Sequence, residues 1–494
     1  MIQVQLFDLS FQYEVQPLIK AFYQPEDVSV GAIEDASGSF GGFLIDDPDG
    51  KLICAYYEDG QLIQRVEAPF ADVEQGERKN HLKRTLYDLL HALSGRELPW
   101  GTLTGIRPVK IAMKMISDGA EDEAVRDFMR KTYYVSDERI NLALDIAKRE
   151  KRILSGLHLT EGFSLYIGIP FCPTTCMYCS FTSYPIAKYA KLVDRYLQAL
   201  DAELALAGEV FRGKILDTIY IGGGTPTTLE PDQMHRLKEM ISAHFDLSHL
   251  AEFTMEAGRP DSITEEKLSA MRDIGIDRIS VNPQTMHDET LAVIGRRHTV
   301  QQAKDAFHLA REAGFSNINM DIILGLPGED AGMVKGTLEQ IEALGPDSLT
   351  VHSMAIKRAA AMHDYLSAHP EKQSINTPEM MGLCADYADQ MDMHPYYLYR
   401  QKNMAGNFEN VGYAKDGKYG LYNILIMEEV QSIAAVGAGT ISKSVMRADR
   451  IERCDTIKDV SLYLDSIDEM IGKKRAFYER TIQNQQEKEP PECH

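Results

Sequence analysis

The stretch LYIGIPFCPTTCMYCSF, residues 165–181, decides the fold of this chain. An apolar strand leads directly into a loop that carries Cys172, Cys176 and Cys179 in a C-x3-C-x2-C pattern. Thiolates are the usual ligands of iron–sulfur clusters, and one tight loop with this spacing can reach three irons of a cubane. We therefore expect these cysteines to hold a 4Fe–4S cluster.

A structural zinc site is the competing interpretation of the three cysteines. Zinc takes four ligands in structural sites, and no fourth ligand follows at knuckle spacing. Three thiolates on a cubane instead leave one iron open, and an open iron can chelate the amino and carboxylate groups of an amino acid. One electron can then cleave a sulfonium held there into methionine and a 5′-deoxyadenosyl radical. The pattern favours this redox chemistry.

After Gly162 the sequence alternates short apolar segments with amphipathic helical ones, which is typical of a parallel sheet with helical crossovers. The expected strands are SLYIGIPF, LDTIYIGG, EFTMEAG, RISVNPQ, INMDIILGLP and SLTVHSM. Six such units predict an α/β fold with a partly open (β/α)6 barrel. Chemistry in such folds lies at the carboxyl ends of the strands, where these segments end in Gly, Pro or polar residues.

The regions that flank the barrel have other patterns. Residues 51–68 indicate a hairpin that turns at Asp59-Gly60. The expected division is an N-terminal α+β region at 1–85, a helical region at 86–158, the barrel at 159–355, a C-terminal α+β extension covering the substrate at 356–480, and a disordered tail at 481–494.

The composition narrows the classes of partner. With 52 Lys and Arg against 74 Asp and Glu, the net charge is -22. A surface this acidic disfavours nucleic acid and anionic membranes. The sequence shows no signal peptide and no apolar run near the ~18 residues of a membrane span. Seven unevenly spaced cysteines argue against a disulfide framework. We expect a cytoplasmic monomer without nucleic-acid or membrane partners.

The cysteine loop at the end of the first barrel strand resembles the signature of the radical SAM superfamily. Its lead-in, Tyr-x-x-Ile-Pro-Phe-Cys, is similar to that of the oxygen-independent coproporphyrinogen III oxidase (dehydrogenase) family. Further segments match motifs of this family in order along the chain. They are GGGTPT at 222–227, TMEAG at 254–258, RISVNPQTM at 278–286, IGRRH at 294–298 and MDIILGLPG at 320–328.

The resemblance implies a set of residues around S-adenosylmethionine. Those expected to contact this cofactor are Tyr166, Phe181, Gly223, Gly224, Thr225, Glu256, Gln284, Arg296 and Asp321. In the family, the glycine loop meets the amino group, the arginine binds the carboxylate in a bidentate contact, and the aspartate lies near the ribose hydroxyls. The resemblance also makes Tyr166 the expected catalytic residue, near cluster and substrate.

Three positions depart from the family pattern. Gly-Arg-Pro follows Glu256 where Asn-Pro is usual, and Gly168 stands where the family commonly has a histidine. Phe181 occupies the place of a cysteine that the decarboxylating members carry. Because Gly168 stands in place of the family's histidine, this chain lacks any proton-donating role of that histidine.

The resemblance leaves three functions open. The first is oxidative decarboxylation of coproporphyrinogen III propionates to vinyls, giving protoporphyrinogen IX for haem biosynthesis, with a one-electron donor such as flavodoxin or ferredoxin. The second is a haem chaperone, whose His-Asn-x-x-Tyr-Trp motif corresponds here to NMAGNFENVGY at 403–413, without His or Trp; His352 or His394 are alternative haem ligands. The third is another radical reaction on a tetrapyrrole, such as methyl transfer or ring opening.

The long N-terminal region favours the first function. Its segment GRELPWGTLTGIRPVKI at 95–111 resembles the HemZ-type subgroup, and the resemblance implies a radical SAM oxidoreductase. Coproporphyrinogen carries four carboxylates, so an acidic chain needs a local cationic cluster to bind it. The candidates are Arg259, Arg297, Lys357, Arg358, Arg400 and Lys402.

Overall fold

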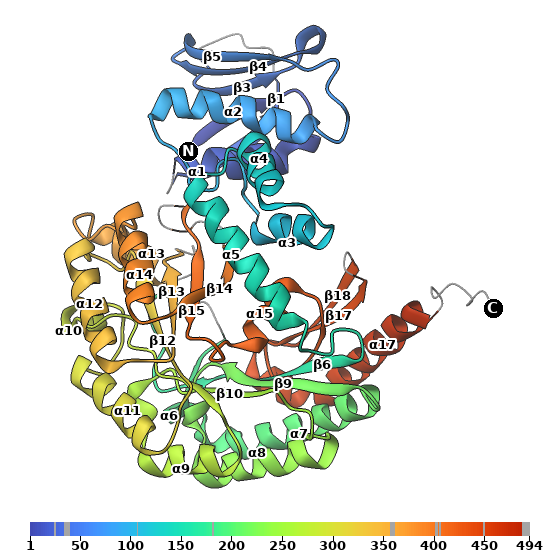
Figure 1. The fold of residues 1–494 in the computed structure, drawn as a ribbon, viewed down its shortest axis with the longest axis vertical. Coiled ribbons are helices and arrows are strands. Elements are labelled where there is room, and N and C mark those ends of the chain that lie inside the picture. The colour runs from blue at the N-terminus through green and yellow to red at the C-terminus, as the bar shows by residue number, and fades with distance from the viewer. Residues whose placement is uncertain are drawn as a thin grey trace. The chain divides into compact units, whose positions relative to one another are not determined.

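The computed structural model describes residues 1–23, 26–33, 40–105, 107–179, 182–355, 361–400, 404, 407–447 and 450–486. The chain divides into two compact units (Figure 1). Residues 1–148 with 398–409 form the N-terminal unit, and residues 149–397 with 410–494 form the barrel unit.

The N-terminal unit is built on a mixed sheet with the strand order β2-β1-β3-β4-β5. Its strands are β1 (Ile2–Leu6), β2 (Val28–Ala32), β3 (Gly42–Asp46), β4 (Lys51–Glu58) and β5 (Gln61–Pro69). The β4–β5 hairpin turns at Asp59 and Gly60, as predicted, and both residues have positive φ (46° and 78°), which tight hairpin turns require. Helices α1 (Gln12–Phe22) and α2 (Arg78–Ser94) bury their apolar faces in the core of this unit.

Three helices continue the N-terminal unit: α3 (Val109–Ser117), α4 (Asp122–Tyr133) and α5 (Asp137–Leu154). The only tryptophan, Trp100, is fully buried, and its indole N–H donates to Oε2 of Glu409 at 2.7 Å. Nε of Arg139 lies 2.9 Å from Oε1 of the same buried carboxylate. This charged contact explains why residues 398–409 belong to the N-terminal unit and not to a C-terminal region.

The barrel unit confirms the predicted (β/α)6 fold. Six parallel strands lie side by side in chain order. They are β6 (Gly162–Ile169), β9 (Ile215–Gly223), β10 (Glu252–Glu256), β11 (Arg278–Ser280), β12 (Ile318–Leu324) and β13 (Ser348–Ser353). Two short strands, β7 (Phe171–Cys172) and β8 (Tyr184–Pro185), pair beyond β6.

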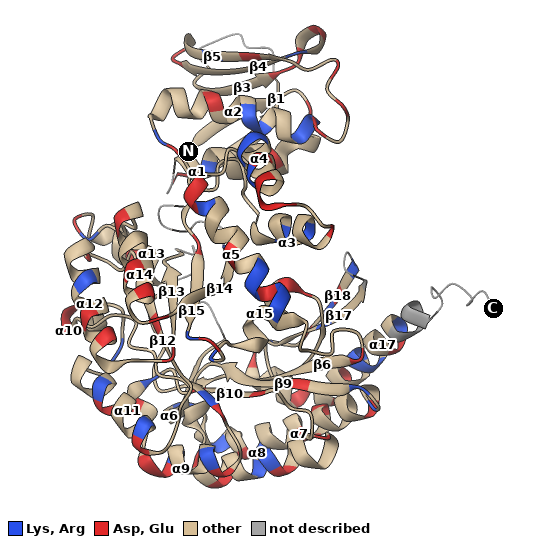
Figure 2. Cartoon of the chain, in the orientation of Figure 1, with Lys and Arg blue, Asp and Glu red and all other residues tan. Residues whose placement is uncertain are grey.

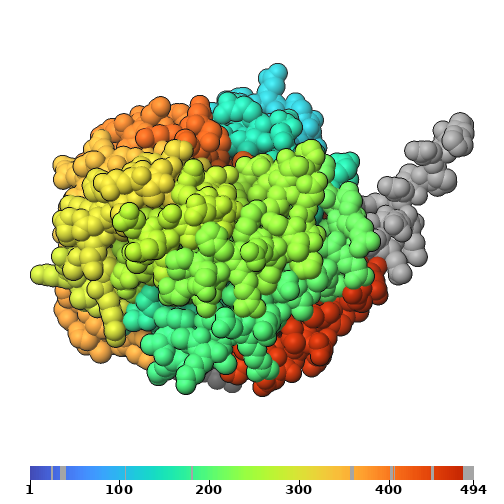
Figure 3. All heavy atoms as spheres, turned by 90° about the horizontal axis from the view of Figure 1, so that it is seen from below, coloured from blue at the N-terminus to red at the C-terminus, as the bar shows by residue number. Residues whose placement is uncertain are grey.

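Helices cover the outer face of this sheet (Figures 1 and 3). The main ones are α7 (Val193–Val210), α8 (Pro231–His244), α9 (Glu265–Asp273), α11 (Val300–Glu312) and α12 (Ala331–Leu344). Acidic and basic residues are interspersed along them (Figure 2). In the described part of the chain, no helix is both long and apolar enough to span a bilayer.

The C-terminal segment extends the barrel sheet at both edges, giving eleven strands. At the β13 edge lie β15 (Asn410–Ala414) and then β14 (His394–Tyr399); at the β6 edge lie β16 (Ser432–Val436), β17 (Ile441–Arg447) and β18 (Arg450–Asp455). Because β16 pairs in parallel with β6, the described part of the extension expected at 356–480 contributes strands to the barrel sheet itself. Helix α17 (Ile467–Gln486) also runs through 481, where the tail was expected to begin; residues 487–494 lie outside the described residues.

Replacement of Glu409 by Ala tests the buried contact in the N-terminal unit. The change leaves the Arg139 guanidinium without its buried carboxylate, so we expect the free energy of unfolding of this unit to fall by about 3–5 kcal/mol. Trp100 fluorescence during urea unfolding reports on this unit, because it is the sole tryptophan. Glu138→Ala is the matched control, since Glu138 also pairs with Arg139 but is 72% exposed, and should cost less than about 1 kcal/mol. Equal losses in the two variants would contradict this account.

Candidate active site

The three predicted cluster ligands lie directly beyond the carboxyl end of β6. Cys172 ends β7 and is 7% exposed, whereas Cys176 and Cys179 are half-buried in the following loop. This loop is tied to the barrel by the N–H of Met177, which donates to the carbonyl of Ile294 at 3.0 Å. The six cysteines among the described residues are free thiols.

The glycine loop after β9 packs directly against the cysteine loop. The N–H of Gly224 donates to the carbonyl of Ile169, and the N–H of Thr225 to that of Phe171, both at 2.7 Å. The Thr225 hydroxyl donates to Sγ of Cys172 at 3.5 Å. A Cβ at Gly224 would lie 2.6 Å from the Phe171 carbonyl oxygen and 3.0 Å from that sulfur. Only glycine permits this approach.

Glu256, the last residue of β10, presents a half-buried carboxylate beside the glycine loop. It accepts a hydrogen bond from the hydroxyl of Tyr220 at 2.6 Å and another from the N–H of Gly223, whose φ of 106° suits glycine. Burial raises the pKa of Glu256 to about 7, and the charge of Asp321 adds to the shift. The carboxyl group is therefore poised between its two protonation states near neutral pH.

Tyr166 belongs to a stack of three tyrosines that the sequence did not reveal. Its ring lies 6.1 Å from that of Tyr220 on β9 and 5.9 Å from that of Tyr422 on α15 (Leu421–Glu428), at interplanar angles of 15° and 20°. The rings of Tyr220 and Tyr422 are 4.7 Å apart. The alternation of side chains along β9 could have predicted that Tyr220, two residues before Gly222, faces the barrel interior. No local sequence pattern predicts that Tyr422, a helix residue, lies beside it.

Gln284 and Asn282 follow β11 and carry acceptors that the protein does not use. Gln284 has a positive φ of 70°, and its backbone bridges to β12 through the carbonyl of Asp321 and the N–H of Ile323. Oε1 of Gln284 and Oδ1 of Asn282 are buried and have no hydrogen-bond partner among the described residues. Buried acceptors without partners are costly, so these atoms indicate a place for a polar ligand.

Arg296 is buried and contacts the cysteine loop through Tyr178. Its Nη1 donates to the carbonyls of Gly258 and Asn282 at 2.9 and 3.3 Å. Nε and Nη2 both donate to the hydroxyl of Tyr178, at 3.3 and 2.9 Å, and Tyr178 lies between the second and third cysteines. Four of the five guanidinium N–H groups thus donate to these acceptors, which leaves one N–H of Nη2 for a carboxylate; the expected bidentate contact would have to share or replace another.

Asp321 lies on β12, where its carboxylate is positioned by two neighbours. Nδ2 of Asn319 donates to Oδ1 at 2.6 Å, and Nε2 of His352 lies 3.6 Å from Oδ2. Burial by itself would raise the pKa of Asp321, but these two contacts hold the pKa below its usual value. Asp321 therefore remains an ionised acceptor.

Of the six candidate cations for a substrate, Arg259 and Arg400 have other partners, Arg297 is exposed, and three lie outside the described residues. Arg259 contacts the cysteine loop and not open space: its Nη1 lies 3.6 Å from Sγ of Cys176. Arg400 is buried and donates to the carbonyl of Leu103 and to Asn407, while Arg297 is exposed. The positions outside the described residues are Lys357, Arg358 and Lys402, and the expected cofactor contact Phe181 is also among them.

The described residues fit a cubane cluster with S-adenosylmethionine. No three His, Cys, Asp or Glu side chains among them lie close enough to share one metal ion. In a 4Fe–4S cluster each thiolate binds a different iron, so a wider spacing of the cysteines is compatible with this group. The glycine that permits close approach and the unpaired acceptors of Gln284 and Asn282 provide room and partners for a polar cofactor.

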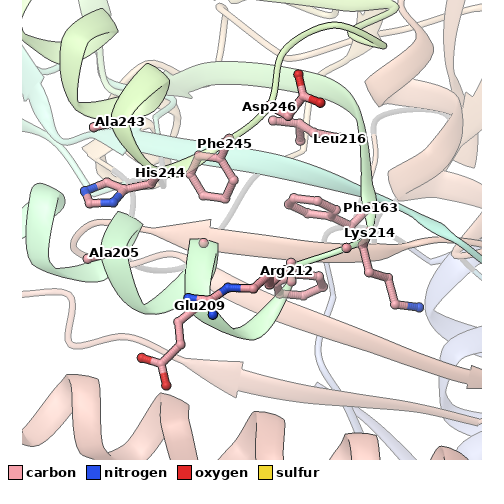
Figure 4. A pocket seen from close by; sticks show the side chains of 13 residues that line it. Phe163, Ala205, Glu209, Arg212, Lys214, Leu216, Ala243, His244, Phe245 and Asp246 are labelled. Carbon is pink, nitrogen blue, oxygen red and sulfur yellow. The ribbon is translucent and has the colours of Figure 1, made fainter.

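A hollow of about 510 Å3 lies elsewhere, at the amino ends of the strands (Figure 4). Phe163 and Leu216, near the starts of β6 and β9, line it together with Arg212, Lys214 and Phe245. Since the cysteines follow the opposite ends of these strands, the hollow is not part of the candidate active site.

Comparisons with known proteins agree with this geometry. The family model of the Radical SAM superfamily matches residues 166–341. The chain is 37% identical over 484 residues to the oxygen-independent coproporphyrinogen-III oxidase-like protein HemZ of Bacillus subtilis, covering 95% of this chain and 96% of that protein. It is 30% identical to the heme chaperone HemW of B. subtilis, covering 66% of this chain and 81% of the chaperone.

A solved structure shows the same fold. The coproporphyrinogen III oxidase HemN of Escherichia coli, a radical SAM enzyme, superposes with a TM-score of 0.51 at 22% identity, over 66% of this chain and 72% of HemN. The chain therefore belongs to the radical SAM superfamily, whose members use a 4Fe–4S cluster and S-adenosylmethionine, and within it to the coproporphyrinogen-III oxidase-like proteins.

Proposed function

We propose that this chain is an oxidoreductase that converts propionate side chains of coproporphyrinogen III into vinyl groups, giving protoporphyrinogen IX. The observation that carries the proposal is the similarity over 95% of the chain to an oxidase-like protein, since it includes both structural units. In each conversion the propionate loses a hydrogen atom, and then carbon dioxide and one electron.

The cofactors supply one step, the one-electron cleavage of S-adenosylmethionine to a carbon radical that abstracts hydrogen. The electron comes from a donor of the flavodoxin or ferredoxin class. Cys172, Cys176 and Cys179 hold the cluster, and the backbone at 223–225 binds the methionine end of S-adenosylmethionine at close range. The packing of Gly224 against the cysteine loop supports this assignment.

Four polar side chains orient S-adenosylmethionine in this proposal. Glu256 binds its positively charged end, and Asp321 accepts from the ribose hydroxyls. Gln284 contributes its unpaired Oε1, and Arg296 faces the carboxylate while holding Tyr178. Glu256 ends β10, Gln284 follows β11 and Asp321 lies within β12, while Arg296 comes after helix α10 (Asp288–Val293). The ligand would therefore lie across the carboxyl ends of these neighbouring strands.

Tyr166 is the residue that we assign to the reacting centre. At Gly168, the histidine position of the family, a Cβ would lie 2.6 Å from Cγ2 of Thr440, so no larger side chain fits there. Burial raises the pKa of Tyr166, followed by the effect of Glu256, so its hydroxyl stays protonated at neutral pH and can donate. The stack with Tyr220 and Tyr422 fixes its ring.

A haem chaperone is the second candidate, favoured by 30% identity to HemW. Two residues of the stretch that corresponds to the chaperone motif have structural partners: Glu409 binds Trp100, and Oδ1 of Asn410 accepts from the N–H of Ser353 at 2.8 Å. The candidate haem ligands of this alternative are His352 on β13, which lies 3.6 Å from Asp321 on β12, and His394 at the start of β14. Haem binding that is lost in His352→Ala would support it.

Anaerobic turnover tests the proposed reaction. The iron-reconstituted chain is incubated with S-adenosylmethionine, dithionite and coproporphyrinogen III, and products are followed by mass spectrometry. We expect 5′-deoxyadenosine that depends on the substrate, and tetrapyrrole masses that fall by one and then two equivalents of HCOOH.

A variant with Cys172, Cys176 and Cys179 replaced by Ala is the control and should form neither product. Cofactor cleavage with an unchanged tetrapyrrole would reject decarboxylation; haem retained by the same preparation would then favour the chaperone.

The affinity for S-adenosylmethionine should depend on pH through Glu256. Its pKa of about 7 in the free protein means that the binding-competent carboxylate is a minority form at pH 6 and the majority at pH 8. Binding to the ionised form alone therefore strengthens about tenfold between these pH values and releases a proton at pH 6. Equilibrium dialysis against the oxidised, reconstituted protein measures this change without turnover.

Glu256→Gln separates this effect from titration of the ligand. The variant keeps the shape of the side chain, and we expect it to bind weakly at both pH values. Any pH dependence that persists in the variant belongs to the ligand, and the difference between the curves belongs to Glu256. Parallel curves for the two proteins would remove Glu256 from the site.

A further inference from the structure

Arg259 follows β10, and its side chain, which is 4% exposed, contacts the cysteine loop. Nη1 donates to Sγ of Cys176 at 3.6 Å, and to the hydroxyl and carbonyl of Thr174 at 3.1 and 3.3 Å. A guanidinium is charged at any physiological pH, so the contact to sulfur is a charge-assisted hydrogen bond to a cluster ligand.

Asp261 fixes the direction of this guanidinium. Nε and Nη2 of Arg259 donate to the two carboxylate oxygens at 2.8 and 2.7 Å, a paired contact that sets the plane of the group and directs Nη1 toward Cys176. Burial opposes ionisation of Asp261, but the arginine holds the pKa of this carboxyl below its usual value. The pair therefore stays charged at neutral pH.

Reduction adds one negative charge to a cluster that three thiolates already make anionic. Hydrogen bonds to ligand sulfurs and nearby positive charge stabilise the reduced form more than the oxidised form, because the attraction grows with the charge on the cluster. A carboxylate beside the arginine has the opposite effect. Arg259 and Asp261 thus act on the same equilibrium with opposite signs.

We propose that Arg259 is a positioning residue that raises the reduction potential of the cluster through the Cys176 thiolate. In the step concerned, a one-electron donor of the flavodoxin or ferredoxin class is oxidised and the cluster is reduced by one electron; no bond forms or breaks. The inference depends on the cluster but not on the tetrapyrrole substrate. It gives a function to Arg259 in the segment Gly-Arg-Pro, at a place where the family usually has Asn-Pro.

A redox titration of the reconstituted full chain without substrate tests the proposal. The fraction of reduced cluster is measured from its electron paramagnetic resonance signal at a series of fixed potentials. For Arg259→Gln we expect the ratio of reduced to oxidised cluster at a given potential to fall about tenfold, which is about 59 mV for a one-electron couple. For Asp261→Asn we expect the ratio to rise, because the opposing charge is gone while the amide oxygen still accepts from Arg259 and keeps the guanidinium near Cys176.

Two further variants complete the design. Arg259→Lys keeps the charge and should shift the potential less than Arg259→Gln. Arg311→Gln is the matched control, since it breaks another arginine–aspartate pair, with Nη1 2.6 Å from Oδ2 of Asp347, at the amino end of β13, and should leave the potential unchanged.

Iron and sulfide contents equal to those of the unaltered chain show that each variant holds its cluster. An unchanged potential in Arg259→Gln at full iron content, or shifts of the same sign in Arg259→Gln and Asp261→Asn, would overturn the proposal. If Arg259→Gln loses its iron, Arg259→Lys and Asp261→Asn decide: a rise in Asp261→Asn supports the proposal, and its absence rejects it.

Discussion

Backbone contact between the cysteine loop and the glycine loop is the constraint on which the rest of the site depends. The two loops follow adjacent parallel strands that pair Ile169 with Gly223, so they leave the sheet at the same level. Hydrogen bonds at 2.7 Å then join them, and the space between Gly224 and Cys172 leaves no room for a Cβ. The carboxylate of Glu256 lies against the same glycine loop. A chain without glycine here would separate the cluster ligands from the groups proposed to hold S-adenosylmethionine.

The features that could be predicted from sequence are those with a local pattern. Each parallel strand is a short apolar run with its own turn residues, so all six were located, and the hairpin at Asp59-Gly60 followed from its turn chemistry. The cysteine spacing likewise needs no tertiary information. Pairing between distant segments left no such pattern. The sequence of residues 432–436 does not predict that they pair with β6. The residues around Glu409 likewise do not predict that its carboxylate accepts a hydrogen bond from Trp100.

Arg259 shows the same limit at a single residue. Arg259 was interpreted as a candidate cation for the substrate because the chain is acidic. The residue is buried, however, and its guanidinium donates to Asp261 and Cys176. Glu256 is the converse case: its half-buried carboxylate has a tyrosine hydroxyl and a backbone N–H as partners in place of a cation, and desolvation raises its pKa to about 7. Glu256 ends β10 and Arg259 lies just beyond it, so the type of partner and not the location decides whether the charge is retained.

The C-terminal segment reaches this site through the strand that it adds to the barrel. The loop at 437–440 packs on β6 so closely that a Cβ at Gly437 would lie 2.6 Å from the carbonyl oxygen of Gly168. The N–H of Gly437 donates to buried Glu203 at 2.6 Å, and Lys474 on α17 pairs with the same carboxylate. A charge deleted from α17 would leave Glu203 buried without a cation and loosen its hold on this loop. Gly168 lies two residues after Tyr166, so these contacts define the surface of the barrel next to Tyr166. Thr440, Gly437 and Lys474, which make them, are far from Tyr166 in sequence.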